Sequence, residues 1–242
     1  MVATFAAILT AFLLGSLIYH CGRTNSRAHP LWSPTLHATV VSLVAYLLLG
    51  NFHWPILLCL FLTQAGLHAI GLHRHSASLA PWLALHFVNL GLLLALAYCF
   101  PAAALDGWWA TAMTPEHSRW YFVALTFSSG LMLCIPAGGE LIARITRRFA
   151  AEIRDTDIAG LTRGGLYIGW LERFLVLLLL LIDQPNGIGF LIAAKSILRF
   201  GEIKDPAQRK LAEYIIIGTF LSFGWALLIA VLTQKALRHW MP

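Results

Sequence analysis

The chain has 242 residues, of which 59% are hydrophobic and only 12% are charged, and its mean hydropathy is +0.73. Soluble domains carry about 25% charged residues, so this composition excludes an ordinary soluble protein and indicates several membrane-spanning helices. The net charge of +6 does not indicate nucleic-acid binding, because the basic residues fall in short connections between apolar segments, where membrane topology accounts for them.

Apolar segments follow one another along the whole chain, separated by short polar connections. A helix needs about 20 mostly apolar residues to span a bilayer, so the length allows about eight spans with tight connections. The sequence therefore predicts an all-α fold, a polytopic transmembrane helical bundle with about eight membrane helices. Segment 187–200 is short, and the sequence leaves open whether it crosses fully. The expected segments are residues 2–20, 35–50, 55–72, 81–100, 120–137, 166–183, 187–200 and 213–233.

Positive charges are divided unevenly between alternate connections. Most arginine and lysine residues fall in 21–34, 73–80, 138–165 and 201–212. The positive-inside rule places these connections in the cytoplasm and the N-terminus outside it. The sequence thus predicts a multi-pass membrane protein. Its expected partners are the lipid bilayer, with other membrane-protein subunits or anionic lipid as further candidates, and no nucleic acid.

Three parts are expected along the chain: an N-terminal four-helix half (1–103), a middle part (104–164) and a C-terminal three-helix unit (165–242). The middle part holds an outer loop, the fifth span and a basic segment. The motif "PAGG" is expected to break the fifth span, after which the basic segment lies on the cytoplasmic membrane surface or extends the span directly. The aromatic residues of the outer loop indicate a belt at headgroup level; they are Trp108, Trp109, Trp120 and Tyr121.

Charged residues inside the C-terminal apolar segments are the first candidate site. Two acids and three bases are expected at one depth on three consecutive helices, and buried charge in a bilayer is costly unless it is paired. The expected pairs are Glu172 with Lys195, and Glu213 with both Arg199 and Arg173. The cluster is either a structural clamp for the three helices, a binding pocket for an anionic headgroup or solute, or part of a proton or ion path.

Three histidines form the second candidate site. His37, His68 and His86 lie near the cytoplasmic ends of three apolar segments. They are interpreted as polar histidines hydrogen-bonded between helices, as metal ligands, or as axial ligands of a haem or other tetrapyrrole. A hydrolytic metal site normally includes a carboxylate, and no Asp or Glu precedes Asp106. The cofactor, if any, is unknown from sequence.

Three stretches of the C-terminal third are similar to the signature of an uncharacterised bacterial family of polytopic inner-membrane proteins, a domain of unknown function. These stretches are "GLYIGWLERFLVLLLLLIDQ", "IGFLIAAKSILRFGEIKD" and "RKLAEYIIIGTFLSFGWALLIA". The charged candidates Glu172, Arg173, Lys195, Arg199 and Glu213 all stand at signature positions.

The N-terminal part resembles the same family less closely. Family members resemble a membrane-embedded hydrolase with His and Asp motifs on the first helices. Here His37, His68 and His86 fit three of the histidine positions, but Phe12 replaces the histidine of the first motif and every acid is replaced, for example by Leu72 and Trp82. The resemblance therefore implies a catalytically degenerate member with an intact C-terminal unit.

The predicted function is that of an integral inner-membrane protein without evident catalytic machinery, acting as an accessory, scaffold or lipid/anion-binding subunit of a membrane complex. A membrane-embedded metal-dependent hydrolase is the principal alternative. A small-solute transporter and a cofactor-bearing subunit of an electron-transfer or light-harvesting complex are further alternatives.

Overall fold

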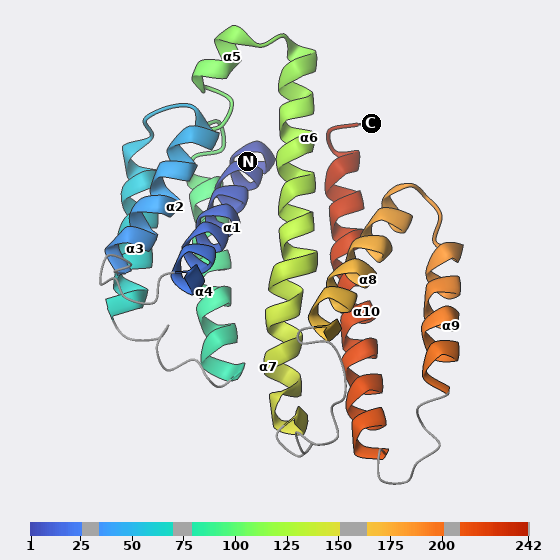
Figure 1. The fold of residues 1–242 in the computed structure, drawn as a ribbon. Coiled ribbons are helices and arrows are strands. Elements are labelled where there is room, and N and C mark those ends of the chain that lie inside the picture. The colour runs from blue at the N-terminus through green and yellow to red at the C-terminus, as the bar shows by residue number, and fades with distance from the viewer. Residues whose placement is uncertain (26–33, 70–78, 151–163, 201–208, 242) are drawn as a thin grey trace. The chain divides into compact units, whose positions relative to one another are not determined.

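In the computed structural model, every regular element is a helix over the part of the chain that is described (Figure 1). This agrees with the all-α class predicted from the sequence. A few side chains at helix ends, those of His68 and Arg199 among them, lie outside the description. The described residues are 1–25, 34–69, 79–150, 164–200 and 209–241.

Several helices are long and apolar enough to cross a membrane. Five segments meet this condition, namely Val2–Tyr19, Leu79–Cys99, Pro115–Ala150, Gly164–Leu181 and Ala212–Arg238. Three shorter apolar helices cover Thr35–Leu49, Trp54–Leu67 and Asn186–Ile197. The described helices therefore indicate a membrane protein with several spans, whereas the count of about eight spans stays a prediction.

The chain divides into two compact units, Met1–Ser129 and Gly130–Pro242. The boundary falls inside one helix, α6 (Pro115–Met132), so the first unit contains most of this helix and the second its last residues. The three-part division expected from the sequence stays a prediction.

The first unit is built on close packing of its first helices. Helix α1 packs against α2, α2 against α3, and α1 also against α4. Because Gly15 has no side chain, α1 approaches the α2 backbone closely: an added Cβ would lie 2.8 Å from Val41 Cα. The helices of this unit before α6 are α1 (Val2–Asn25), α2 (Pro34–Leu49), α3 (Trp54–Ala69), α4 (Leu79–Cys99) and α5 (Trp108–Ala112).

Part of the aromatic segment that is predicted to be an outer loop belongs to the core of the first unit. Gly50 has a φ of 71°, and its carbonyl accepts a hydrogen bond from the Trp108 N–H at 2.7 Å. The Trp109 ring covers Gly50 and is only 4% exposed, and the Tyr121 hydroxyl donates to the Leu48 carbonyl at 2.6 Å. Trp109 therefore packs inside the protein, where the glycine turn makes room for its ring, and the belt at headgroup level stays a prediction.

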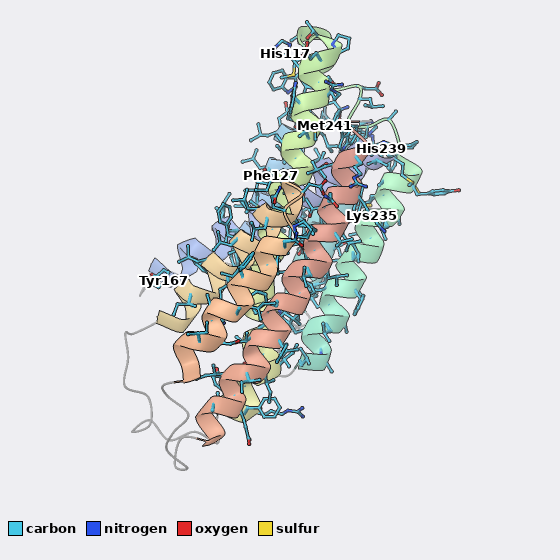
Figure 2. All side chains as sticks on the ribbon, turned by 90° about the vertical axis from the view of Figure 1, so that its right-hand side faces the viewer. His117, Phe127, Tyr167, Lys235, His239 and Met241 are labelled. Atoms are coloured by element: carbon cyan, nitrogen blue, oxygen red, sulfur yellow. The ribbon has the colours of Figure 1, made fainter. Side chains whose placement is uncertain are left out.

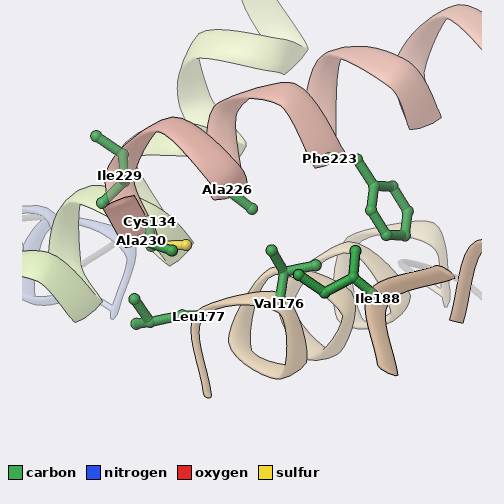
Figure 3. Packing of buried hydrophobic residues seen from close by; sticks show 8 residues of the cluster. All are labelled: Cys134, Val176, Leu177, Ile188, Phe223, Ala226, Ile229 and Ala230. Carbon is green, nitrogen blue, oxygen red and sulfur yellow. The ribbon is translucent and has the colours of Figure 1, made fainter. Parts of the chain in front are cut away.

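The second unit has its core where α8 (Gly164–Leu181) packs against α10 (Arg209–Arg238). Figure 3 shows side chains of α10 facing those of α8, with Ile188 of α9 (Asn186–Phe200) beside them. Small residues on α10 allow the two helices to lie close together. The buried cluster consists of Cys134, Val176, Leu177, Ile188, Phe223, Ala226, Ile229 and Ala230.

A π-helix connects α6 to α7 (Gly138–Ala150) without a break. This element, η1 (Leu133–Ala137), contains Pro136, which has no N–H to donate. The Gly138 N–H donates to the Leu133 carbonyl five residues earlier, so the wider turn accommodates the proline. The expected break at "PAGG" is therefore wrong, and the chain continues as the direct extension that was the alternative. The rest of the basic segment, residues 151–163, lies outside the described residues.

Candidate functional site: the charged cluster of the second unit

The α8–α9 hairpin places Glu172 opposite Lys195. Helix α8 ends at Leu181 and α9 begins at Asn186, so both charged residues lie nine residues from the turn (172 to 181 and 186 to 195). The turn is closed by Asp183 at a φ of 61° and by a hydrogen bond from the Gln184 N–H to the Leu179 carbonyl at 2.8 Å. Equal spacing on two antiparallel helices brings the two side chains to one level.

The two charges form an ion pair. Lys195 Nζ lies 2.6 Å from Glu172 Oε2, and the side chains are only 16% and 10% exposed. The same ammonium group lies 5.8 Å from the centroid of the Phe223 ring on α10, within the range of a cation–π contact. The predicted Glu172–Lys195 pair is thus confirmed, and it links α8, α9 and α10.

Arg173 follows Glu172 in sequence but faces other elements. Successive residues on a helix point about 100° apart, so Arg173 turns away from α9 and toward η1 and α10. Its Nη1 donates to Ser222 Oγ at 3.0 Å, and the side chain is buried. The expected pair with Glu213 is wrong for Arg173, because Ser222 lies in the core and Glu213 is on the exposed part of α10.

Glycines surround the Arg173 guanidinium. An added Cβ at Gly139 would lie 3.1 Å from Nη2, and one at Gly169 would lie 3.3 Å from Nη1. Trp170 also approaches this point, since its Nε1 lies 3.6 Å from the same Cβ position at Gly139. Arg173 Nε is buried and has no hydrogen-bond partner among the described residues. The two glycines therefore let the backbone pack directly against the guanidinium, and a side chain at either position would crowd it.

The π-helix also contributes polar groups to this region. The Leu133 carbonyl accepts a hydrogen bond from Trp225 Nε1 of α10 at 2.9 Å. The Cys134 thiol donates to the Arg173 carbonyl at 3.5 Å, which joins η1 to α8. These bonds hold η1, α8 and α10 together around Arg173, and none of them supplies a nucleophile with an adjacent base.

The remaining member of the predicted cluster cannot be placed. The Arg199 side chain lies outside the description, so its predicted pair with Glu213 stays a prediction. The structure thus brings Glu172, Arg173 and Lys195 together on adjacent faces of one helical hairpin.

The histidines do not form a common site among the described side chains. His37 is buried on α2, with its Nε2 3.3 Å from Ser16 Oγ and its ring 4.7 Å from that of Tyr19. His86 on α4 is exposed; its Nδ1 lies 2.8 Å from the Trp82 carbonyl and its ring stacks on the Trp82 indole. The described residues contain no group of three His, Cys, Asp or Glu that could hold a metal ion. Because the His68 side chain is not described, a site that includes it stays a prediction.

Two amides near the histidines bond to each other. Gln64 lies one turn before His68, and Asn89 lies about one turn after His86. Gln64 Nε2 donates to Asn89 Oδ1 at 2.6 Å, and Asn89 Nδ2 donates to the Leu85 carbonyl of its own helix. His86 is partnered by its own helix instead of by Asn89.

Sequence reasoning missed the partners of Arg173. Ser222 is one of many small polar residues in apolar helices, and nothing in its spacing marks it as a partner. The "PAGG" motif was the available signal. Its proline favours an irregular helical turn, and its two glycines allow another side chain to lie close to the backbone. It was interpreted as a helix break.

No family model, curated protein or solved structure matches the chain. The resemblance to an uncharacterised family therefore stays a prediction.

Proposed function

We propose that this chain is a multi-pass protein of the bacterial inner membrane that acts as an accessory or scaffold subunit of a membrane complex, without catalytic chemistry of its own. The proposal includes about eight membrane helices and an N-terminus outside the cytoplasm. The charge distribution of the connections supports this orientation.

The Glu172–Lys195 ion pair is the observation that carries the proposal. Glu172 lies near the centre of the candidate span Gly164–Leu181. An ionised side chain at this depth raises the free energy of the membrane-inserted protein, so such residues usually have a functional or structural role. Each charge is paired with the other in the 2.6 Å contact. Neither side chain is therefore an obvious general acid or general base for a reaction. A buried pair of this kind fixes the register of helices, which is the property a scaffold needs.

Helix α9 offers the surface that such a scaffold would present. Apart from Ile188 its described side chains are partly or largely exposed, and Phe190 and Ile197 are more than two-thirds exposed. The pair at Lys195 is therefore the main polar link that positions this helix on α8. Lipid covers this apolar face in a lone subunit, and another membrane helix covers it in a complex.

Cross-linking in native membranes tests the proposal. The tagged full-length chain is expected to give a reproducible cross-linked species that Lys195→Ala abolishes, because α9 loses its position. Lys235→Ala is the matched control: Lys235 is exposed near the C-terminal end of α10, beside His239 and away from Tyr167 (Figure 2). A chain that remains single in native membranes, with either lysine present or absent, contradicts the scaffold proposal.

A further inference from the structure

Helix α10 runs antiparallel to the helix that continues through η1 into α7, and two glycines fix the register between them. An added Cβ at Gly130 would meet the Thr233 side chain, and one at Gly138 would lie 2.5 Å from Trp225 Nε1. The two points are eight residues apart on each helix (130 to 138 and 233 to 225), so the helices advance in step. They also remain in contact along α7.

This register shows how far α7 reaches relative to the apolar part of α10. Residues 214–232 of α10 contain no Asp, Glu, Lys or Arg and cover about 28 Å, which matches the hydrocarbon core of a bilayer. Glu213 therefore marks one boundary of this core. The register places Glu213 opposite Ala150, the last residue of α7 (138 to 150 and 225 to 213). On α10, Phe220 lies inside the boundary and is 71% exposed, as expected of a side chain that contacts lipid.

The exposed side of α7 is basic at the same level. Thr146 is buried, whereas Arg147 and Arg148 are exposed. Arg144 is engaged by Glu140 at 2.7 Å, while Arg148 forms no ion pair with any described residue. Arg147 and Arg148 precede the end of α7 by three and two residues, so their backbone lies about 3 to 5 Å inside the boundary.

Arginines at this depth reach the headgroup layer of the membrane. An ionised guanidinium is unfavourable in hydrocarbon, and the long apolar stem of arginine lets the charged end extend to the interface. The groups found there are lipid phosphates, and basic residues near the surface attract anionic lipids. An acidic protein in the aqueous phase would instead require these side chains to lie beyond the headgroups.

We infer that the exposed side of α7, through Arg147 and Arg148, binds the headgroups of anionic phospholipids in the adjacent leaflet. Helix α7 thus joins the lipid surface along its side while its buried side packs on α10. This inference deepens the proposed function and rests on it for membrane insertion alone, since lipid binding needs no protein partner.

Native mass spectrometry of the full-length chain in mixed micelles of phosphatidylglycerol and phosphatidylcholine tests the inference. The wild-type chain is expected to retain phosphatidylglycerol in preference to phosphatidylcholine. The preference should fall about fivefold for each of Arg147→Gln and Arg148→Gln, because each removes one basic residue near the surface. Both side chains are exposed, so the variants should fold as the wild type does.

The matched control is the double variant Arg147→Lys with Arg148→Lys, which keeps both charges and should keep most of the preference. Equal retention of the two lipids by the wild-type chain overturns the inference, and an acidic protein as the true partner gives this result. An unchanged preference in the double glutamine variant overturns it too, as does a loss in the lysine variant equal to that in the glutamine variant. A chain that retains neither lipid contradicts membrane insertion, and with it both the proposed function and the inference. Because the isolated chain is used, absence of a cross-linked partner does not affect this result.

Discussion

The two units of the chain differ in whether they bury acidic and basic side chains. Among the described residues, the first unit buries polar side chains other than Asp, Glu, Lys and Arg, namely Thr4, Thr10, His37, Gln64, Asn89 and Ser129. The second unit buries Thr146, Ser222 and Thr233, but in addition it buries Glu172 and Arg173 and nearly buries Lys195. Neutral groups are satisfied by one or two short bonds, such as that between Thr10 Oγ1 and Ser129 Oγ at 2.7 Å. Charges require partners on specific neighbouring helices.

This difference indicates where each unit obtains its specificity. In the first unit, close contact of backbones at Gly15 positions α1 on α2. In the second unit, α9 has little buried surface, so packing does little to position it on α8. The ion pair between Lys195 and Glu172 positions it instead. We therefore expect the second unit to be most sensitive to loss of charge and the first to added volume.

The largest effect is expected for Lys195→Ala. It leaves Glu172 buried without a partner, which should lower the free energy of unfolding by about 3 kcal/mol. Denaturant titration in mild detergent measures this change. The double substitution Glu172→Gln with Lys195→Met removes both charges and should restore most of the loss. Equal stability of wild type and Lys195→Ala would show that the pair does not stabilise the second unit.

A smaller effect is expected for Gly15→Ala in the first unit. The added methyl group meets the Val41 backbone at 2.8 Å, so α1 and α2 must separate, at a cost of about 2 kcal/mol. Thermal melting in the same detergent measures it. Gly91→Ala, where an added Cβ meets nothing within 4 Å, should leave the melting temperature unchanged. A similar response of both variants would refute close packing as the source of specificity.

Gln64→Leu is expected to cost about 1 kcal/mol, because Asn89 Oδ1 loses its donor at 2.6 Å. The neighbouring Thr63→Val removes only a bond to the carbonyl of its own helix, from Cys59, and should change stability little. Comparison of the two unfolding midpoints isolates the bond between helices. The neutral network contributes nothing if both midpoints equal that of the wild type.

Arg144→Gln is expected to have the smallest effect. Its ion pair with Glu140 spans one turn of α7, and the side chains are 21% and 42% exposed. Such pairs contribute about 0.3 kcal/mol. The melting temperature should therefore fall by less than the shift caused by Gln64→Leu, and the shift should disappear at high salt. A loss as large as that of Lys195→Ala would remove the distinction between buried and exposed pairs.

Much of the local structure followed from composition and spacing. Runs of apolar residues have to form helices in a bilayer, because a helix satisfies its own backbone hydrogen bonds. The pair between Glu172 and Lys195 was predictable because the turn "DQPN" lies midway between them. The partner of Arg173 was not predictable from the sequence. Arg173 is one residue after Glu172 on α8 and so faces a different neighbouring element, and the packing of α10 places Ser222 beside it.

The region around Pro136 shows the same limit. A proline followed by glycines predicts a broken helix from local propensity alone. The structure instead has a π-turn whose Leu133 carbonyl is shared by Gly138 and by Trp225 from α10. The sequence by itself determined that the chain is helical, apolar enough for a membrane and paired at Glu172 and Lys195. Only the tertiary structure decided which donors surround Gly139, because contacts between distant helices depend on how those helices pack.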